Sequence, residues 1–196
     1  MSELPDGTAA DGNSDIMQAT YRALRDHGYA DLTVQRIADE YGKSTAAIHY
    51  HYDTKEDLLA AFLDYLLARF VDAIRDIETT DPDARLSLLL DELLAKPAET
   101  QGLSVALLEM RSQAPYNDAF RERFAQNDEY VRYALKAVIN HGIDEGAFAD
   151  VDAERAAHAL LSIADGGRTR AVVFDDMSEL ELARQTASEY VDATLR

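Results

Sequence analysis

Apolar residues recur every three to four positions along most of this chain, which is the spacing that gathers them on one face of an α-helix. No segment alternates between apolar and polar residues as a half-buried strand would. The sequence therefore predicts an all-α fold with about nine helices. The expected helices cover residues 14–27, 33–41, 44–50, 54–74, 82–97, 103–113, 117–145, 152–174 and 178–195.

Short polar residues and glycines mark the ends of several of these helices. Thr54 and Asp57 stand three residues apart at a helix start, as do Ser178 and Glu181, and this is the spacing of a capping box. Gly42 closes the second helix and leaves only a tight turn before the third. We therefore expect three short N-terminal helices followed by longer ones.

The composition is that of a helical globular protein, with 47% hydrophobic residues and only four prolines. Residues 1–13 have no helical period and contain proline and glycine, so we expect a disordered tail there. The chain has no cysteine, which excludes disulfides, thiolate metal sites and a cysteine nucleophile. It also lacks a signal-peptide pattern and any apolar run of the roughly 18–20 residues that span a membrane. We expect a cytoplasmic protein without membrane contact.

The charge balance is strongly acidic and unusual in kind. The formal net charge is −18, with 37 acidic against 19 basic residues, and only four of the basic residues are lysine. Aspartate (23) outnumbers glutamate (14). Short carboxylates hold water and counterions tightly, whereas lysine stems expose apolar surface that concentrated salt makes less soluble. This pattern predicts a protein adapted to molar intracellular salt, as in salt-loving archaea; an acidic protein from dilute salt is the alternative.

The third short helix has the outline of a DNA-reading helix. It begins with the small residues Ser44, Thr45 and Ala46, which would let its backbone approach bases in a major groove. Donor side chains flank these residues, while the spacing of Ile48 and Tyr52 turns both toward the core. The donors are Lys43, His49, Tyr50 and His51.

The run "LTVQRIADEYGKSTAAIHYHYDTKEDLL", residues 32–59, resembles the DNA-binding segment of the tetracycline-repressor (TetR/AcrR) family of transcription regulators. The shared positions are Thr33, Ile37, Ala38, Gly42, Ser44, Ile48, Tyr50, His51, Tyr52, Lys55, Glu56, Asp57 and Leu58. A second run, "LLEMRSQAPYNDAFRERF", is similar to the ligand-domain subgroup that includes betaine-type regulators. The resemblance divides the chain into a helix-turn-helix domain over residues 14–58 and a ligand-binding and dimerisation domain over residues 59–196.

The resemblance implies a homodimeric repressor that binds a palindromic operator in double-stranded DNA and is released by a small-molecule effector. It assigns phosphate contacts to Thr33 and Lys55, and backbone contacts to Tyr50 and His51. Ser44, Thr45, Ala46 and His49 would face the groove. Two positions depart from the family pattern: Ala46 replaces a usual glycine and His49 a usual tyrosine.

The effector site is less determined by the sequence, and an apolar or acyl-chain ligand is favoured by the aliphatic content alone. The candidate polar residues are Glu109, Arg111, Gln113, Asn117, Asn127, Tyr130, His158 and Arg168. The candidate apolar residues are Phe62, Leu66, Leu107, Met110, Phe120 and Phe124. Surface or interhelical pairing of the polar group, and ordinary core packing of the apolar group, remain alternatives. Ligand binding is expected to shift the fourth helix, which begins at Thr54, and so to change the separation of the two DNA-reading helices.

Other functions find little support. His49 and His51 are two residues apart, so a helix points them in different directions and a metal pair is not expected. No serine lies in a G-x-S-x-G setting, and Gly166-Gly167 follows no strand, so we expect neither an enzyme nor a bound cofactor. Small residues such as Ala156 in the eighth helix favour close helix crossing at a dimer interface with the ninth helix; packing of the same helices within one chain is the alternative. The competing hypothesis is a helical small-molecule-binding or interaction protein without DNA binding.

Overall fold

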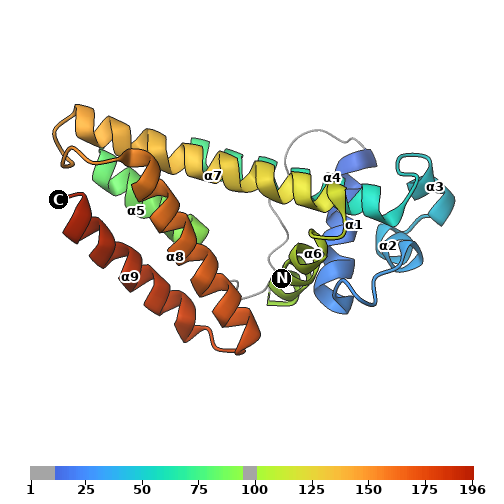
Figure 1. The fold of residues 1–196 in the computed structure, drawn as a ribbon. Coiled ribbons are helices and arrows are strands. Elements are labelled where there is room, and N and C mark those ends of the chain that lie inside the picture. The colour runs from blue at the N-terminus through green and yellow to red at the C-terminus, as the bar shows by residue number, and fades with distance from the viewer. Residues whose placement is uncertain (1–11, 95–100) are drawn as a thin grey trace.

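The structure is a computed structural model of the chain, and it describes residues 12–94 and 101–196. These residues form nine helices and no strand, which confirms the predicted all-α class (Figure 1). The helices are α1 (Gly12–His27), α2 (Val34–Tyr41), α3 (Thr45–His49), α4 (Lys55–Arg75), α5 (Pro82–Leu93), α6 (Gln101–Gln113), α7 (Asp118–Asp144), α8 (Ala153–Val173) and α9 (Ser178–Thr194).

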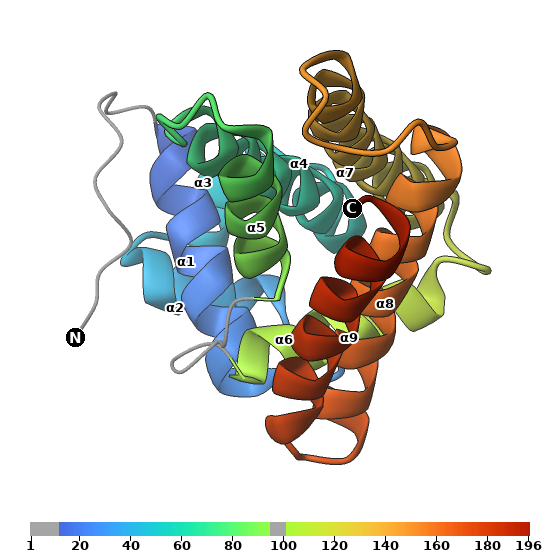
Figure 2. The ribbon, with the colours of Figure 1, turned by 90° about the vertical axis from the view of Figure 1, so that its left-hand side faces the viewer.

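The three short helices gather with the start of α4 at one end of the molecule, and α8 and α9 lie side by side at the other (Figures 1 and 2). The long α4 and α7 pack on each other and join the two ends. One buried apolar cluster unites α1, α2 and α3 with Phe62 and Leu63 of α4, Met110 of α6 and Phe120 of α7. A second cluster unites α5, α7, α8 and α9.

The predicted division at residue 58 falls inside α4, and it stays a prediction. Leu58 and Leu59 on either side of it are fully buried in the same N-terminal cluster. That cluster also takes residues from α6 and α7, so the core of the N-terminal end is completed by the C-terminal part of the chain. The two regions therefore share packing at their junction.

The predicted ends of the first and fifth helices differ from those in the structure. The predicted tail over residues 1–13 lies outside the described residues as far as residue 11, but Gly12 and Asn13 already belong to α1, and the Tyr52 hydroxyl donates a hydrogen bond to Asn13. The helix predicted to reach residue 97 ends at Leu93, and residues 95–100 lie outside the described part.

The capping box predicted at Ser178 is wrong, because Ser178 is the first residue of α9 rather than its cap. Met177 occupies the N-cap position and makes no side-chain capping bond. The Asp176 carboxylate instead accepts a hydrogen bond of 2.9 Å from the Ser178 backbone N–H. Hydrogen bonding to Ser178 also lowers the pKa of Asp176. The start of α9 is thus set by Asp176 in the preceding turn.

Within the described residues, every helix is too short or too polar to cross a membrane.

Candidate nucleic-acid interface and interhelical cavity

The turn between α2 and α3 is built by a capped start and a left-handed stop. Thr33 caps α2, its hydroxyl accepting a hydrogen bond of 3.2 Å from the Arg36 backbone N–H. Gly42 ends α2 with φ +70°, a conformation that glycine adopts without a steric penalty. The Lys43 N–H then bonds to the Ala38 carbonyl at 3.2 Å. This arrangement is the expected helix-turn-helix geometry.

The exposed face of α3 carries the side chains that sequence analysis proposed for reading DNA. Ile48 is 1% exposed and anchors α3 in the N-terminal cluster. Ser44, Ala46 and His49 are exposed, and Thr45 is half-buried. Ser44 holds the N-cap position without a side-chain capping bond, so its hydroxyl is not committed to the helix. The His49 Nδ1 lies 3.3 Å from the Tyr52 carbonyl oxygen.

Aromatic and basic side chains flank α3 on both sides. Tyr50 is 85% exposed, and its ring contacts the His51 ring edge-to-face at 5.1 Å between centroids. Tyr52 is half-buried and packs against the N-terminal cluster, as its spacing predicted. Before α3, the Lys43 ammonium donates a hydrogen bond of 2.9 Å to the Tyr41 hydroxyl, and this bond raises the pKa of Lys43. The side chains of Lys43, Tyr50 and His51 are therefore exposed on either side of α3.

Lys55, the first residue of α4, is held close to the start of α2. Its ammonium donates a hydrogen bond of 3.3 Å to the Leu32 carbonyl and lies 5.0 Å from the centre of the Tyr29 ring. Leu32 directly precedes Thr33 in the chain. The hydrogen bond from Lys55 to Leu32 thus links the two proposed phosphate contacts, Thr33 and Lys55.

Three of the carboxylates at this end have hydrogen-bond partners inside the protein, and one of the three partners is a cation. Residues 31–57 contain three basic and six acidic side chains, which is not a basic patch. Glu40 pairs with Arg22 at 3.1 Å, and Asp39 accepts a hydrogen bond of 2.8 Å from Gln35. Asp57 caps α4 by accepting from the Thr54 backbone N–H at 3.1 Å. Half of the six carboxylates therefore have hydrogen-bond partners within the fold.

A cavity of about 460 Å³ lies between α4, α5, α6, α7, α8 and α9. We call it the interhelical cavity. Aliphatic and aromatic side chains make most of its wall. The lining residues from α4 are Leu63, Leu66, Leu67 and Phe70, and those from α6 are Leu103, Ser104, Leu107, Leu108 and Arg111. Phe124, Asn127, Asp128 and Val131 of α7 and Leu161, Asp165, Arg168 and Thr169 of α8 also line it.

A network of ion pairs forms the polar part of this wall. Arg111 bonds to both Asp128 and Asp165, each at 3.1 Å for the shortest contact, and Asp165 also pairs with Arg168. Burial lowers the pKa of Arg111, but the two carboxylates outweigh it and raise the pKa overall. Burial raises the pKa of Asp128 more than Arg111 lowers it. The carboxamide oxygen of Asn127 is buried without a hydrogen-bond partner in the described part of the chain.

The fourteen residues predicted for the effector site separate in space. The six that line the interhelical cavity together are Leu66, Leu107, Arg111, Phe124, Asn127 and Arg168. Phe62, Met110 and Phe120 are fully buried in the N-terminal cluster and do not line it. Glu109, Gln113, Asn117, Tyr130 and His158 lie outside its wall as well. Sequence reasoning left Asp128 and Asp165 out of its candidates, because their shared partner Arg111 comes from another helix and sequence spacing alone cannot identify such contacts.

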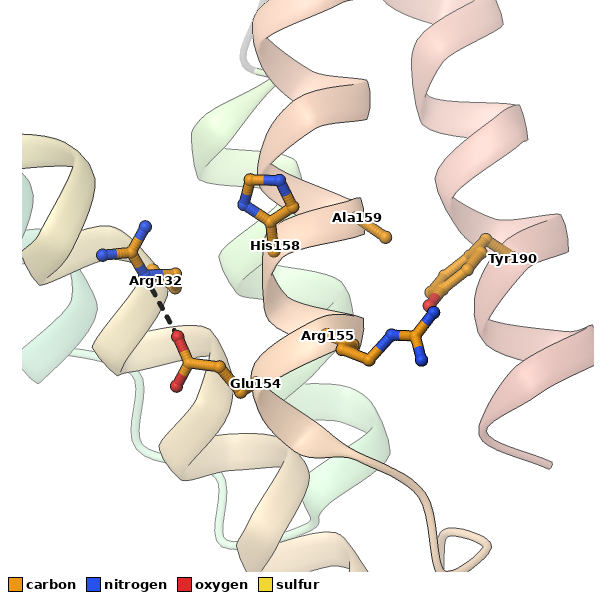
Figure 3. A pocket seen from close by; sticks show the side chains of 6 residues that line it. All are labelled: Arg132, Glu154, Arg155, His158, Ala159 and Tyr190. Atoms are coloured by element: carbon orange, nitrogen blue, oxygen red, sulfur yellow. Dashed lines mark ion pairs between the residues drawn. The ribbon is translucent and has the colours of Figure 1, made fainter.

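His158 lies in a second, shallower hollow between α7, α8 and α9 (Figure 3). Arg132 of α7 and Glu154 of α8 form an ion pair of 3.3 Å across it. Arg155 and Tyr190 point toward each other from α8 and α9 (Figure 3). The hollow is separate from the interhelical cavity and shares no lining residue with it.

Comparison with known proteins matches both parts of the chain to families of regulators. A family described as "Bacterial regulatory proteins, tetR family" matches residues 16–62, and one described as "BetI-type transcriptional repressor, C-terminal" matches residues 82–196. The transcriptional repressor AcnR of Corynebacterium glutamicum is 27% identical over 167 residues, 85% of each chain.

Solved structures of related proteins also match this chain to transcription regulators. A TetR transcription regulator from Haloarcula marismortui is 76% identical, with a TM-score of 0.91 over 96% of this chain and 100% of that one. This similarity to a protein from a salt-loving archaeon fits the predicted halophilic origin. A putative regulator from Saccharomonospora viridis, solved in complex with choline, is 22% identical with a TM-score of 0.83 over 95% of this chain and 98% of that one. At that identity the likeness concerns the fold alone.

Proposed function

This chain belongs to the TetR family of DNA-binding transcriptional regulators, and on that premise we propose that it represses transcription by binding a palindromic operator as a homodimer. A small apolar or acyl-type effector entering the interhelical cavity would release it from DNA. The family consists of DNA-binding regulators rather than enzymes. We expect the protein to act in the cytoplasm, where its operator lies.

The observation that supports this proposal is the course of α4. Its first residue, Lys55, lies beside the proposed phosphate contact Thr33, while Leu66 and Phe70 line the interhelical cavity more than two turns further along. With a rise of about 1.5 Å per residue, a helix of this length spans about 30 Å. One rigid element thus touches both sites, so a shift of α4 by the effector would move the DNA-contacting groups.

Dimerisation is proposed through the outer face of α8 and α9. Val173, Phe174 and Leu182 are each more than half exposed there, although they are large apolar side chains. Gly166 also faces open space, so a second helix could approach the α8 backbone closely. A two-fold arrangement through this face would place two recognition helices about one DNA turn, or about 34 Å, apart. Leu182→Glu should yield monomers in sedimentation, whereas the change at exposed Leu88 of α5, Leu88→Glu, should leave dimers intact.

The proposed effector class follows from the wall of the interhelical cavity, which is mainly leucine, valine and phenylalanine. Such a wall stabilises an apolar body, and the ion-pair network around Arg111 leaves room for a polar end. The Saccharomonospora viridis protein was solved with choline, so a small cation is the natural comparison compound. Medium-chain acyl compounds and choline should therefore be titrated side by side into the protein–DNA complex.

DNA binding is tested with purified protein and its own upstream DNA at about 0.2 to 3 M KCl. We expect saturable, sequence-selective binding that persists in molar salt, where the Debye length of about 3 Å suppresses long-range repulsion. Lys55→Ala and His49→Ala should weaken it. Lys136→Ala is the matched control, because Lys136 pairs with Glu154 on α7 and α8, away from α3.

Absence of selective binding to this DNA at every salt concentration would exclude autoregulation. If selection from genomic fragments also returned no operator, the proposal would be abandoned for that of a helical binding protein without DNA binding. Release of bound DNA by an acyl compound, but not by choline, would support the effector class. The reverse result would overturn that class while leaving the repressor intact.

A further inference from the structure

We propose that Glu109 of α6 is a positioning residue for DNA binding. It binds the connection between α1 and α2 and so holds Lys55 and Thr33 in position to contact phosphate. A ligand in the interhelical cavity would weaken this contact by moving α6. The inference rests on the proposed function and adds a route through α6 to that through α4. It assigns a role to a residue that lies outside the cavity wall.

Helix α6 contacts α1 with one face and lines the interhelical cavity with the opposite face. Gly102, Ala106 and Glu109 follow one another at spacings of four and three residues, so they share one face. Ser104, Leu107 and Arg111 share the reverse face and line the interhelical cavity. The first face packs on α1. A ligand that presses on one side of α6 therefore acts on the contact with α1 through a single helix.

The face toward α1 makes two close backbone contacts. Gly102 lies so near the Arg25 carbonyl that a Cβ atom there would overlap it. Two turns along, the Glu109 carboxylate accepts a hydrogen bond of 2.9 Å from the Tyr29 backbone N–H. Gly28 precedes Tyr29 with φ +70°, so the chain turns sharply out of α1 at this point. Glu109 thus satisfies the backbone N–H of Tyr29, a donor in the turn that follows α1.

Tyr29 links Glu109 to Lys55 and Thr33, the residues proposed to contact phosphate. Its ring lies under the Lys55 ammonium, 5.0 Å from the ring centre, and edge-on to Phe120 at 6.1 Å. The Tyr29 carbonyl accepts from the Leu32 N–H at 3.2 Å, and the Leu32 carbonyl in turn accepts from Lys55. Thr33, the next residue, caps α2. Three short contacts therefore connect Glu109 with Lys55 and with the start of α2.

The Tyr29 ring stays uncharged within this set of contacts. Burial raises the pKa of Tyr29, and the carboxylates of Glu56 and Glu109 raise it further, so its ring stays uncharged under Lys55 at neutral pH. A ligand that displaces α6 would draw Glu109 away from the Tyr29 N–H. The segment from Gly28 to Thr33 would then loosen, and Lys55 would lose its fixed position.

The test compares Glu109→Ala with Glu109→Gln. The glutamine keeps a carbonyl oxygen that can accept from the Tyr29 N–H, whereas alanine does not. Glu129→Ala, at an exposed carboxylate on α7, controls for the loss of one negative charge. Two readouts are measured in the full-length protein: amide hydrogen exchange over residues 28–34, and the dependence of DNA affinity on KCl concentration.

We expect exchange over residues 28–34 to become about tenfold faster in Glu109→Ala and to stay near wild type in the other two variants. DNA binding by Glu109→Ala should weaken about tenfold, and its salt slope should fall by about 0.9 for each phosphate that the variant no longer neutralises. Adding Lys55→Ala should change the slope no further, because both substitutions act on the same phosphate. A merely structural role of Glu109 would lower affinity without altering the slope.

Unchanged exchange and an unchanged slope in a folded Glu109→Ala protein would overturn the proposal. Equal effects of Glu109→Gln and Glu109→Ala would also overturn it, since the hydrogen-bond acceptor would then be irrelevant. Amide exchange requires no DNA. A wild-type protein that binds no operator would therefore defeat the proposed function, while the exchange data would still decide whether Glu109 holds the α1–α2 connection.

Discussion

Thr54 and Asp57 cap α4 reciprocally. The Thr54 hydroxyl accepts a hydrogen bond of 3.0 Å from the Asp57 backbone N–H, and the Asp57 carboxylate accepts one of 3.1 Å from the Thr54 N–H. The pair fixes the residue at which α4 begins. Because Lys55 follows Thr54 directly, the same two bonds set the position of a proposed phosphate contact.

Loss of this cap should weaken both the fold and the DNA interface. We expect Thr54→Ala to lower the free energy of unfolding by about 0.5–2 kcal/mol, as for other N-cap substitutions. Thr54→Ser keeps the hydroxyl and should cost much less. Urea unfolding at one fixed KCl concentration measures both. Equal losses for the two variants would show that the hydroxyl does not carry the stabilisation.

The adjacent glycines of α8 should respond oppositely to alanine. A Cβ at Gly167 would overlap the Ala183 Cβ of α9, and overpacking of this kind costs about 1–3 kcal/mol. Gly166 faces open space within its own subunit, so alanine there should stabilise α8 by up to about 1 kcal/mol in the monomeric Leu182→Glu variant. Urea unfolding at equal protein concentration compares the two glycine substitutions in that variant. Without Leu182→Glu, Gly166→Ala should instead weaken the proposed dimer, and stabilisation there would contradict packing of a second subunit on this face.

The two carboxylates around Arg111 should differ in their effect on stability. Burial raises the pKa of Asp128 above its value in the unfolded chain, so its charged form opposes folding once the pH exceeds the folded pKa. Asp128→Asn should therefore raise the free energy of unfolding at pH 7, and this gain should vanish as the pH falls and Asp128 takes up a proton. Unfolding curves from about pH 7 down to about pH 4 give the profile.

Asp165→Asn should instead lower stability at pH 7, because Arg111 and Arg168 both pair with Asp165. Both arginines would then share the remaining carboxylate or turn to solvent. The result that contradicts this view is a loss of stability in Asp128→Asn as large as that in Asp165→Asn. The network would then act as one unit in which the two carboxylates are equivalent.

Stability should rise with salt. A net charge of −18 repels itself, and raising the ionic strength from about 0.1 to 1 M shortens the Debye length from about 10 to about 3 Å. We expect the thermal midpoint to increase steadily from about 0.1 to 3 M KCl. Sucrose of equal osmolality serves as the uncharged control. A midpoint that rises equally with sucrose would assign the effect to solvent exclusion rather than to charge screening.

The sequence by itself determined the helical class and the helix-turn-helix segment, because both depend on local patterns. Helical spacing of apolar residues requires only the periodicity of a single helix, and Thr33, Gly42 and Thr54 mark helix ends through bonds to residues three or four positions away. The prediction failed at Ser178, where Asp176 supplied the cap. Asp176 and Ser178 both have polar side chains that can bond a backbone N–H at the start of α9, and sequence spacing does not show which of them does so.

Only the tertiary structure decided which distant residues meet. Leu66 and Phe62 belong to the same apolar stripe of α4, yet Leu66 lines the interhelical cavity and Phe62 is sealed in the N-terminal cluster. Arg111 finds carboxylates on two other helices, and Glu109 finds a backbone N–H eighty residues earlier in the chain. Such contacts depend on how helices cross, and crossing is settled by the packing of all their side chains together rather than by the period of any one helix.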